Sequence, residues 1–184
     1  MQLTPELLAL VDRAEPALRE SLPVVFSASD FVAQSCARDP QLIAADLQKP
    51  LSAEEFALRT PQWESDAAPL EAQLMTELRH WRRREMVRIA WRDIAGWAPL
   101  HETLAGLSAF ADAAIGAAYR HARRLLSLRY GEPRSASGEI QPLVVLGMGK
   151  LGGRELNFSS DVDLIFLFPE HGATDGARDR KSVV

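Results

Sequence analysis

Cysteine is nearly absent from this sequence, since Cys36 is the only one in 184 residues. A single cysteine excludes an internal disulfide framework and a cysteine-based zinc site. It suits a reducing cytosol, and we expect Cys36 to be a small core residue rather than a nucleophile. No apolar run approaches the roughly 18 residues of a membrane helix. The N-terminal stretch MQLTPELLAL also lacks the basic region and long apolar core of a secretory signal. We therefore expect a cytoplasmic protein that does not contact a membrane.

An excess of positive charge is also lacking. The chain has 21 Lys and Arg residues against 25 Asp and Glu residues, for a net charge of −4 and a pI of about 5.6. This balance argues against a dedicated nucleic-acid binder. The pattern G-x-S-x-G does not occur, and the four histidines are scattered without metal-ligand spacing. These absences exclude the common serine-hydrolase and histidine-metal sites.

Helix signals dominate residues 1–131. Thr4 and Pro5 mark a first helix to about residue 20, which Pro16 ends or kinks and after which Pro23 breaks the path. Short helices with proline punctuation follow, and Ser52 to Glu55 form a capping-box pattern. Two long helices, over about 70–97 and 101–130, are expected to pack antiparallel. The first has a basic side that we interpret as a solvated face, made of Arg79, Arg82, Arg83, Arg84, Arg88 and Arg92.

The pattern changes after the second long helix. Residues 132–142 are rich in Gly, Pro and Ser and are predicted to be a linker. Short apolar runs replace the helical period from residue 143 onwards. We therefore predict an α+β protein: a mostly helical lobe over 1–131, then the start of an α/β domain over 143–184.

Two aspartates in this second part carry the strongest chemical signal. An apolar run over 143–146 enters a glycine-rich turn, and Asp161 and Asp163 then open a second apolar run over 164–168. Side chains two apart in a strand share a face and lie roughly 7 Å apart by backbone rise. Two carboxylates so placed can hold Mg²⁺ for phosphoryl chemistry.

The glycine-rich turn has two interpretations. A helix beginning at Gly152 and Gly153 would point free N–H groups at a phosphate, with Lys150 either contacting that phosphate or simply solvated. Glycine pair, short helix and acidic pair form the nucleotidyltransferase plan. Alternatively, Gly147, Gly149 and Gly152 fit the G-x-G-x-x-G pattern of a Rossmann-type dinucleotide site. The short connection to Asp161 and the aspartates at the strand entrance argue against that alternative.

The segment GMGKLGGRELNFSSDVDLIFLFPE resembles the signature of the glutamine synthetase adenylyltransferase family, also called the adenylyl-removing enzyme. WRRREMVRIAWRDIAG and SDFVAQSCARDPQLI are similar to its N-terminal half. The resemblance implies two nucleotidyltransferase domains, of which the N-terminal one removes AMP from adenylylated glutamine synthetase. Inorganic phosphate attacks the AMP–tyrosine phosphodiester and ADP leaves. The C-terminal domain adds AMP from ATP, and a PII signalling protein and glutamine control the balance.

The resemblance also implies roles for particular residues. Asp161 and Asp163 would hold Mg²⁺, Gly152 and Gly153 would cradle phosphates, and Ser160 would contact phosphate or support a residue that does. The family's third carboxylate has no counterpart after Phe168, where no apolar strand is expected. We therefore expect a truncated, weakly active or inactive N-terminal piece. A non-catalytic interaction module with a vestigial site is the alternative from another class.

Overall fold

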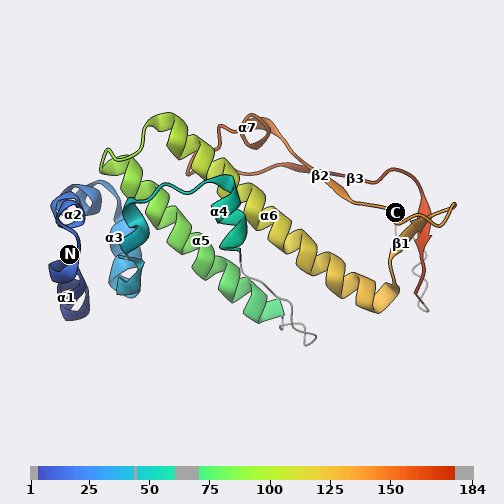
Figure 1. Cartoon of the computed structure of the whole chain (residues 1–184), viewed down its shortest axis with the longest axis horizontal. Coiled ribbons are helices and arrows are strands. Elements are labelled where there is room, and N and C mark those ends of the chain that lie inside the picture. Colours follow the sequence, from blue (N-terminus) through green and yellow to red (C-terminus); the bar gives the residue numbers. More distant parts are fainter. Residues whose placement is uncertain (1–3, 44, 61–70, 177–184) are drawn as a thin grey trace.

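The computed structural model describes residues 4–43, 45–60 and 71–176. A helical lobe followed by two small antiparallel sheets confirms the predicted α+β class (Figure 1). The helices are α1 (Pro5–Arg13), α2 (Pro16–Ala28), α3 (Asp30–Arg38), η1 (Pro40–Leu42), η2 (Ala45–Gln48), α4 (Ala53–Leu58), α5 (Glu71–Ile94), α6 (Leu100–Tyr130) and α7 (Gly149–Gly152). The strands are β1 (Pro133–Ser135), β2 (Val144–Gly147), β3 (Leu164–Leu167) and β4 (Gly172–Thr174).

Of the two prolines predicted to interrupt the first helices, Pro16 does so and Pro23 does not. The Thr4 hydroxyl caps α1, as expected, by accepting a hydrogen bond from Leu7 N. Helix α1 ends at Arg13 and Pro16 begins α2, where the missing N–H of proline costs nothing. The predicted break at Pro23 is wrong, because Pro23 lies inside α2. Burial of the neighbouring Leu22 and Val25 offsets the cost of roughly 3 kcal/mol for an interior proline.

Trp91 of α5 lies at the centre of the first core. It is fully buried and packs edge-on against Phe26, with 5.7 Å between ring centroids. Its indole Nε1 donates to Ser21 Oγ of α2 at 2.9 Å, so the buried polar atom is satisfied. Cys36 is fully buried in the same cluster, and this burial, with Asp39 nearby, raises the pKa of its thiol to about 12. The prediction of a core cysteine is confirmed.

The two longest helices, α5 and α6, are the elements around which the others are arranged. They lie side by side and antiparallel, as predicted, with α2 and α3 against one end of α5 and the β1–β4 pair beyond the far end of α6 (Figure 1). Helix α5 ends at Ile94, three residues before the predicted end, and its predicted start at Leu70 is outside the described residues. Gly96 turns the chain with a φ of +71°, a conformation that glycine adopts without strain.

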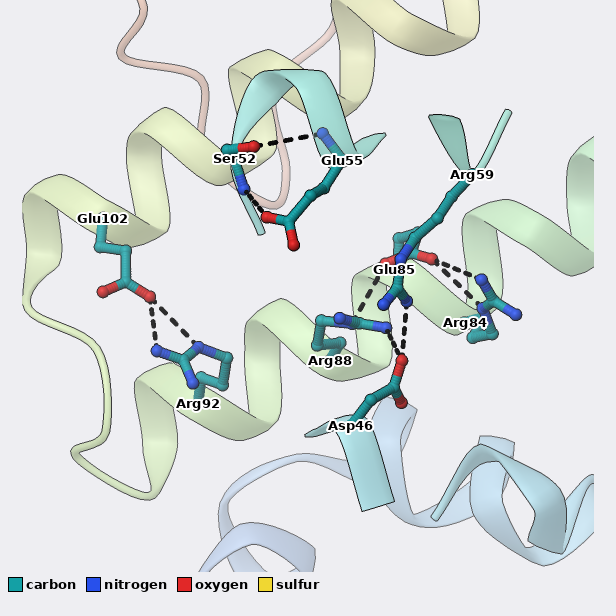
Figure 2. A network of polar contacts seen from close by, with 9 residues as sticks. All are labelled: Asp46, Ser52, Glu55, Arg59, Arg84, Glu85, Arg88, Arg92 and Glu102. Carbon is teal, nitrogen blue, oxygen red and sulfur yellow. Dashed lines mark hydrogen bonds and ion pairs between the residues drawn. The ribbon is translucent and has the colours of Figure 1, made fainter. Parts of the chain in front are cut away.

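The basic side of α5 is not a solvated face along its whole length. Arg79 and Arg82 are exposed, but Arg88 and Arg92 are 2% and 6% exposed. Arg88 Nη2 donates to Asp46 of η2 at 2.9 Å, and its Nε lies 3.2 Å from the fully buried Glu85 (Figure 2). The prediction is wrong there because Asp46, 42 residues earlier, and Glu85, one helical turn away, supply counter-charges that make burial of Arg88 possible.

Figure 2 shows how these ion pairs join separate elements. Arg59, just after α4, donates to the same Asp46 oxygen at 2.7 Å. Arg92 donates to Glu102 of α6 at 2.6 Å and also to the Gln48 carbonyl of η2. The network therefore ties η2, α4 and α6 to α5.

Two antiparallel strand pairs follow the helices. β1 pairs with β4, and β2 pairs with β3. The segment predicted to be a linker therefore contains a strand, and the residues after Phe168 contain its partner, which was not expected. Asp175 fixes this pair by accepting hydrogen bonds from Glu132 N and from the Arg134 side chain. The position of a domain boundary stays a prediction.

The β2–β3 pair leaves much apolar surface open. Val144, Leu146, Ile165, Phe166 and Leu167 are all more than 40% exposed.

Among the described residues, no helix is long and apolar enough to cross a membrane.

Candidate functional site

The register of the β2–β3 pair brings the glycine turn to the acidic pair. Gly147, the last residue of β2, lies opposite Leu164, the first of β3. One step further, Met148 N donates to the carbonyl oxygen of Asp163 at 2.9 Å. The start of α7 and the entrance to β3 are therefore adjacent, although about fifteen residues separate them in the sequence. This adjacency is the central geometric fact of the site.

Asp161 and Asp163 lie in the extended segment that enters β3. Both are exposed, so their carboxylates are open to solvent and ions. Within the described residues, no group of three or more His, Cys, Asp or Glu side chains is close enough to hold a metal. The site as described therefore offers two carboxylates. That they share one face stays a prediction.

The glycines of the turn differ in why a glycine is needed, and the sequence alone did not distinguish them. Gly149 begins α7 with a φ of +54°. A Cβ on Gly152 would lie 2.6 Å from the Gly147 carbonyl oxygen, so α7 approaches β2 too closely for any side chain there. A Cβ on Gly153 would meet nothing closer than 3.6 Å. Packing thus explains Gly152, whereas Gly153 has no steric requirement.

The predicted phosphate cradle requires a helix that begins at Gly152, but α7 begins three residues earlier, at Gly149. Helix α7 ends at Gly152, and Gly153 is its C-terminal cap. Their amides donate within the helix, Gly152 N to Met148 O at 3.4 Å and Gly153 N to Gly149 O at 3.0 Å. Free N–H groups of a helix that starts at this pair are therefore not available. If these glycines bind phosphate, they can do so only because the missing side chains let a ligand come close to the backbone.

Lys150 and Ser160 lie on either side of the turn. Lys150 is exposed on α7, and in the part of the chain that the structure describes it forms no ion pair with either aspartate. Ser160 Oγ lies 2.6 Å from Asn157 Oδ1, to which it donates, and Ser160 N donates to Asn157 O at 3.3 Å. Ser160 thus closes the turn immediately before Asp161. This arrangement fits the prediction that Ser160 supports the aspartate segment better than the prediction that it contacts phosphate.

Helix α6 anchors the whole turn, a feature that sequence reasoning missed. Leu151 and Leu156, 5% and 7% exposed, pack into the second core with Leu107 and Phe110 of α6. The fully buried Ser108 accepts a hydrogen bond from Leu156 N at 3.2 Å. The sequence does give a signal of this anchoring, because Leu151 and Leu156 are apolar residues in a polar stretch. It does not identify their partners on α6, which lie more than 40 residues earlier.

The dinucleotide alternative is excluded by strand direction. A Rossmann unit needs parallel strands joined by a crossover helix of several turns. Here β2 and β3 are antiparallel, and α7 between them has four residues. The G-x-G-x-x-G pattern instead serves a tight turn from a strand into a short helix.

Comparison with known proteins gives one consistent answer. The family described as Glutamate-ammonia ligase adenylyltransferase matches residues 19–183. The chain belongs to this family. Its relatives named "Bifunctional glutamine synthetase adenylyltransferase/adenylyl-removing enzyme" include one from Thioalkalivibrio sulfidiphilus, 46% identical over 191 residues, which covers 96% of this chain and 20% of the relative. Another, from Shewanella loihica, is 44% identical over 173 residues and covers 91% of this chain and 18% of the relative.

The matches cover most of this chain but only a small part of each relative. The chain spans about a fifth of the length of the curated relatives it matches. Membership in the glutamate-ammonia ligase adenylyltransferase family makes the chain homologous to a nucleotidyltransferase enzyme, as the sequence resemblance implied. The matched region includes the glycine turn and both aspartates.

Proposed function

We propose that this chain carries the adenylyl-removing site of a glutamine synthetase regulator. The observation that carries the proposal is the Met148–Asp163 hydrogen bond, which sets the acidic pair beside the glycine turn. In the proposed reaction an oxygen of inorganic phosphate attacks the AMP phosphorus. The bond from phosphorus to the tyrosine oxygen breaks, ADP leaves, and the tyrosine recovers its proton.

The donor set fits magnesium. Asp161 and Asp163 offer exposed carboxylate oxygens, the hard ligands that Mg²⁺ prefers together with water and phosphate oxygens. When bound, Mg²⁺ would neutralise phosphate charge and stabilise the leaving oxygen. The side chains that would hold it are Asp161 and Asp163, and the Ser160–Asn157 turn keeps their segment in place.

The remaining parts of the proposal concern ligands and partners. We propose that the exposed, positively charged Lys150 contacts a phosphate, and that a phosphate approaches the backbone at Gly153, where no close neighbour stands in the way. Adenylylated glutamine synthetase is the proposed protein substrate, since the relatives are named for acting on it. Control by a PII protein and glutamine, and a cytoplasmic location, belong to the same proposal.

Binding of ADP to the isolated chain, measured by calorimetry with and without Mg²⁺, tests the site. We expect Mg²⁺-dependent binding that Asp161→Asn and Asp163→Asn each weaken at least tenfold. Asp12→Asn, an exposed change on α1, is the matched control and should bind as the parent does. Equal affinity with and without Mg²⁺ would contradict a metal-assisted site, and no binding at all would favour the interaction-module alternative.

A further inference from the structure

A groove adjoins the candidate site on the side of the helical lobe. It has a volume of about 370 Å³, within the range of pockets that accept a ligand or a few side chains. Its walls come from α3, α5 and the turn between α7 and β3. The residues that matter for its chemistry are Phe31, Arg82, Met86, Asp93, Ile94 and Phe158.

Phe158 joins the groove to the candidate site. It belongs to the turn that Ser160 closes, and it precedes Asp161 by three residues. Three residues of extended chain span at most roughly 11 Å, so the backbone of Phe158 lies within that distance of Asp161. The groove is therefore on the same part of the surface as the place where the chemistry is proposed.

The groove is apolar where it is open. Phe31 of α3 and Phe158 are 44% and 39% exposed, which is unusual for two large aromatic rings lining one hollow. Met86 and Ala90, 9% and 6% exposed, contribute buried apolar surface from α5. An apolar side chain of a partner lying in the groove would cover part of this surface.

Two charged side chains line the groove, Arg82 and Asp93. Asp93 already accepts a hydrogen bond from Thr103 Oγ1 at 2.8 Å. Arg82 is exposed, and the described residues give its guanidinium neither a hydrogen bond nor an ion pair. A cation beside an apolar hollow is complementary to an acidic residue next to an apolar one.

We propose that this groove holds a loop of the protein substrate, with an apolar side chain between Phe31 and Phe158 and an acidic neighbour at Arg82. The proposal rests on the proposed function, because a side-chain phosphodiester can reach Asp161 and Asp163 only if the surrounding protein lies on this surface.

Binding of adenylylated glutamine synthetase to the full chain, measured by biolayer interferometry, tests the groove. Phe31→Ser and Arg82→Glu should each weaken binding roughly tenfold, as central apolar and charged contacts do. Leu8→Ser, on α1 and 45% exposed, and Arg79→Glu, one turn before Arg82, are matched controls that should bind as the parent does. Mg²⁺-dependent ADP binding should be unchanged in all four variants, which shows that they fold.

The outcomes separate the two proposals. If Phe31→Ser and Arg82→Glu bind glutamine synthetase as tightly as the parent, or if the parent does not bind it, the groove proposal is overturned while the nucleotide site can still stand. If ADP binding fails in the parent but the groove variants lose glutamine synthetase, the site proposal fails and the docking surface stands. A dimer of the chain that Phe31→Ser dissociates in analytical ultracentrifugation would assign the groove to a second copy and overturn it.

Discussion

Ser108 Oγ accepts a hydrogen bond from the backbone N–H of Leu156 at 3.2 Å, across 48 residues of sequence. The same hydroxyl donates to Leu104 O at 2.9 Å inside α6. Both groups of the Ser108–Leu156 bond are buried, and the bond is a polar link between the turn after α7 and the helical lobe.

Replacing Ser108 should loosen this link. Ser108→Ala leaves the buried Leu156 N–H without a partner, at a cost of about 1–3 kcal/mol in the free energy of unfolding. Because the turn leads to Asp161, the Mg²⁺-dependent affinity for ADP should fall as well. Urea unfolding and calorimetry measure the two effects. Ser27→Ala removes an exposed hydroxyl that bonds only its own helix, and it should change neither.

The glycine pair allows packing and binding to be told apart. Gly152→Ala should destabilise the chain by about 1–3 kcal/mol, because its Cβ would overlap the Gly147 carbonyl at 2.6 Å. Gly153→Ala should be neutral or slightly stabilising, since its φ of −79° and ψ of −4° suit alanine. If Gly153 also receives a phosphate, Gly153→Ala will weaken ADP binding at unchanged stability. Thermal melts of both variants decide the first point, and a stable Gly152→Ala would refute the packing role.

The buried charges on α5 should be sensitive to loss of one partner. Arg88→Met leaves the fully buried Glu85 with Arg84 alone, and breaking a buried pair costs about 3–5 kcal/mol. Replacing Glu85 by Leu in the same chain removes the unpaired charge and should recover part of the loss. Denaturant midpoints of the single and double variants measure this coupling. Arg79→Met, an exposed change on the same helix, should stay within about 0.5 kcal/mol of the parent.

Acid should weaken the same network through Asp46. Burial alone would raise the pKa of the Asp46 carboxyl, but hydrogen bonds and charges from Arg59 and Arg88 outweigh burial and lower it. A carboxyl whose pKa is lower in the folded state stabilises that state above its unfolded pKa of about 3.9. The stabilisation is lost as the pH falls through the lower, folded value.

Asp46→Asn should therefore lower the urea midpoint at pH 7, and the difference from the parent should shrink as the pH falls below about 4. Urea titrations between pH 7 and pH 2.5 measure it. Asp12→Asn provides the comparison for a carboxyl on an exposed face. A gap between Asp46→Asn and the parent that stays constant into acid would contradict the role of the ionised carboxylate.

Local signals in the sequence predicted many of the elements. The Thr4 cap and the Ser52–Glu55 capping box both form the hydrogen bonds that the sequence predicts. These features depend on contacts within four residues, which a sequence displays directly. Pro23 shows the limit, because packing of its neighbours outweighs its local preference. The burial of Arg88 shows the same limit, since its partner Asp46 lies 42 residues away.

For the candidate site, side-chain chemistry and spacing were enough to predict the residue types: two aspartates before an apolar strand, a glycine turn, and a family signature. The antiparallel direction of β2 and β3 could not be read from the sequence. Nor could the packing role of Gly152, which Gly153 does not share, or the presence of Ser108 and of the groove beside Phe158 around the site. The physical reason is that register, close approach and burial arise between segments far apart in the chain, where no local preference operates.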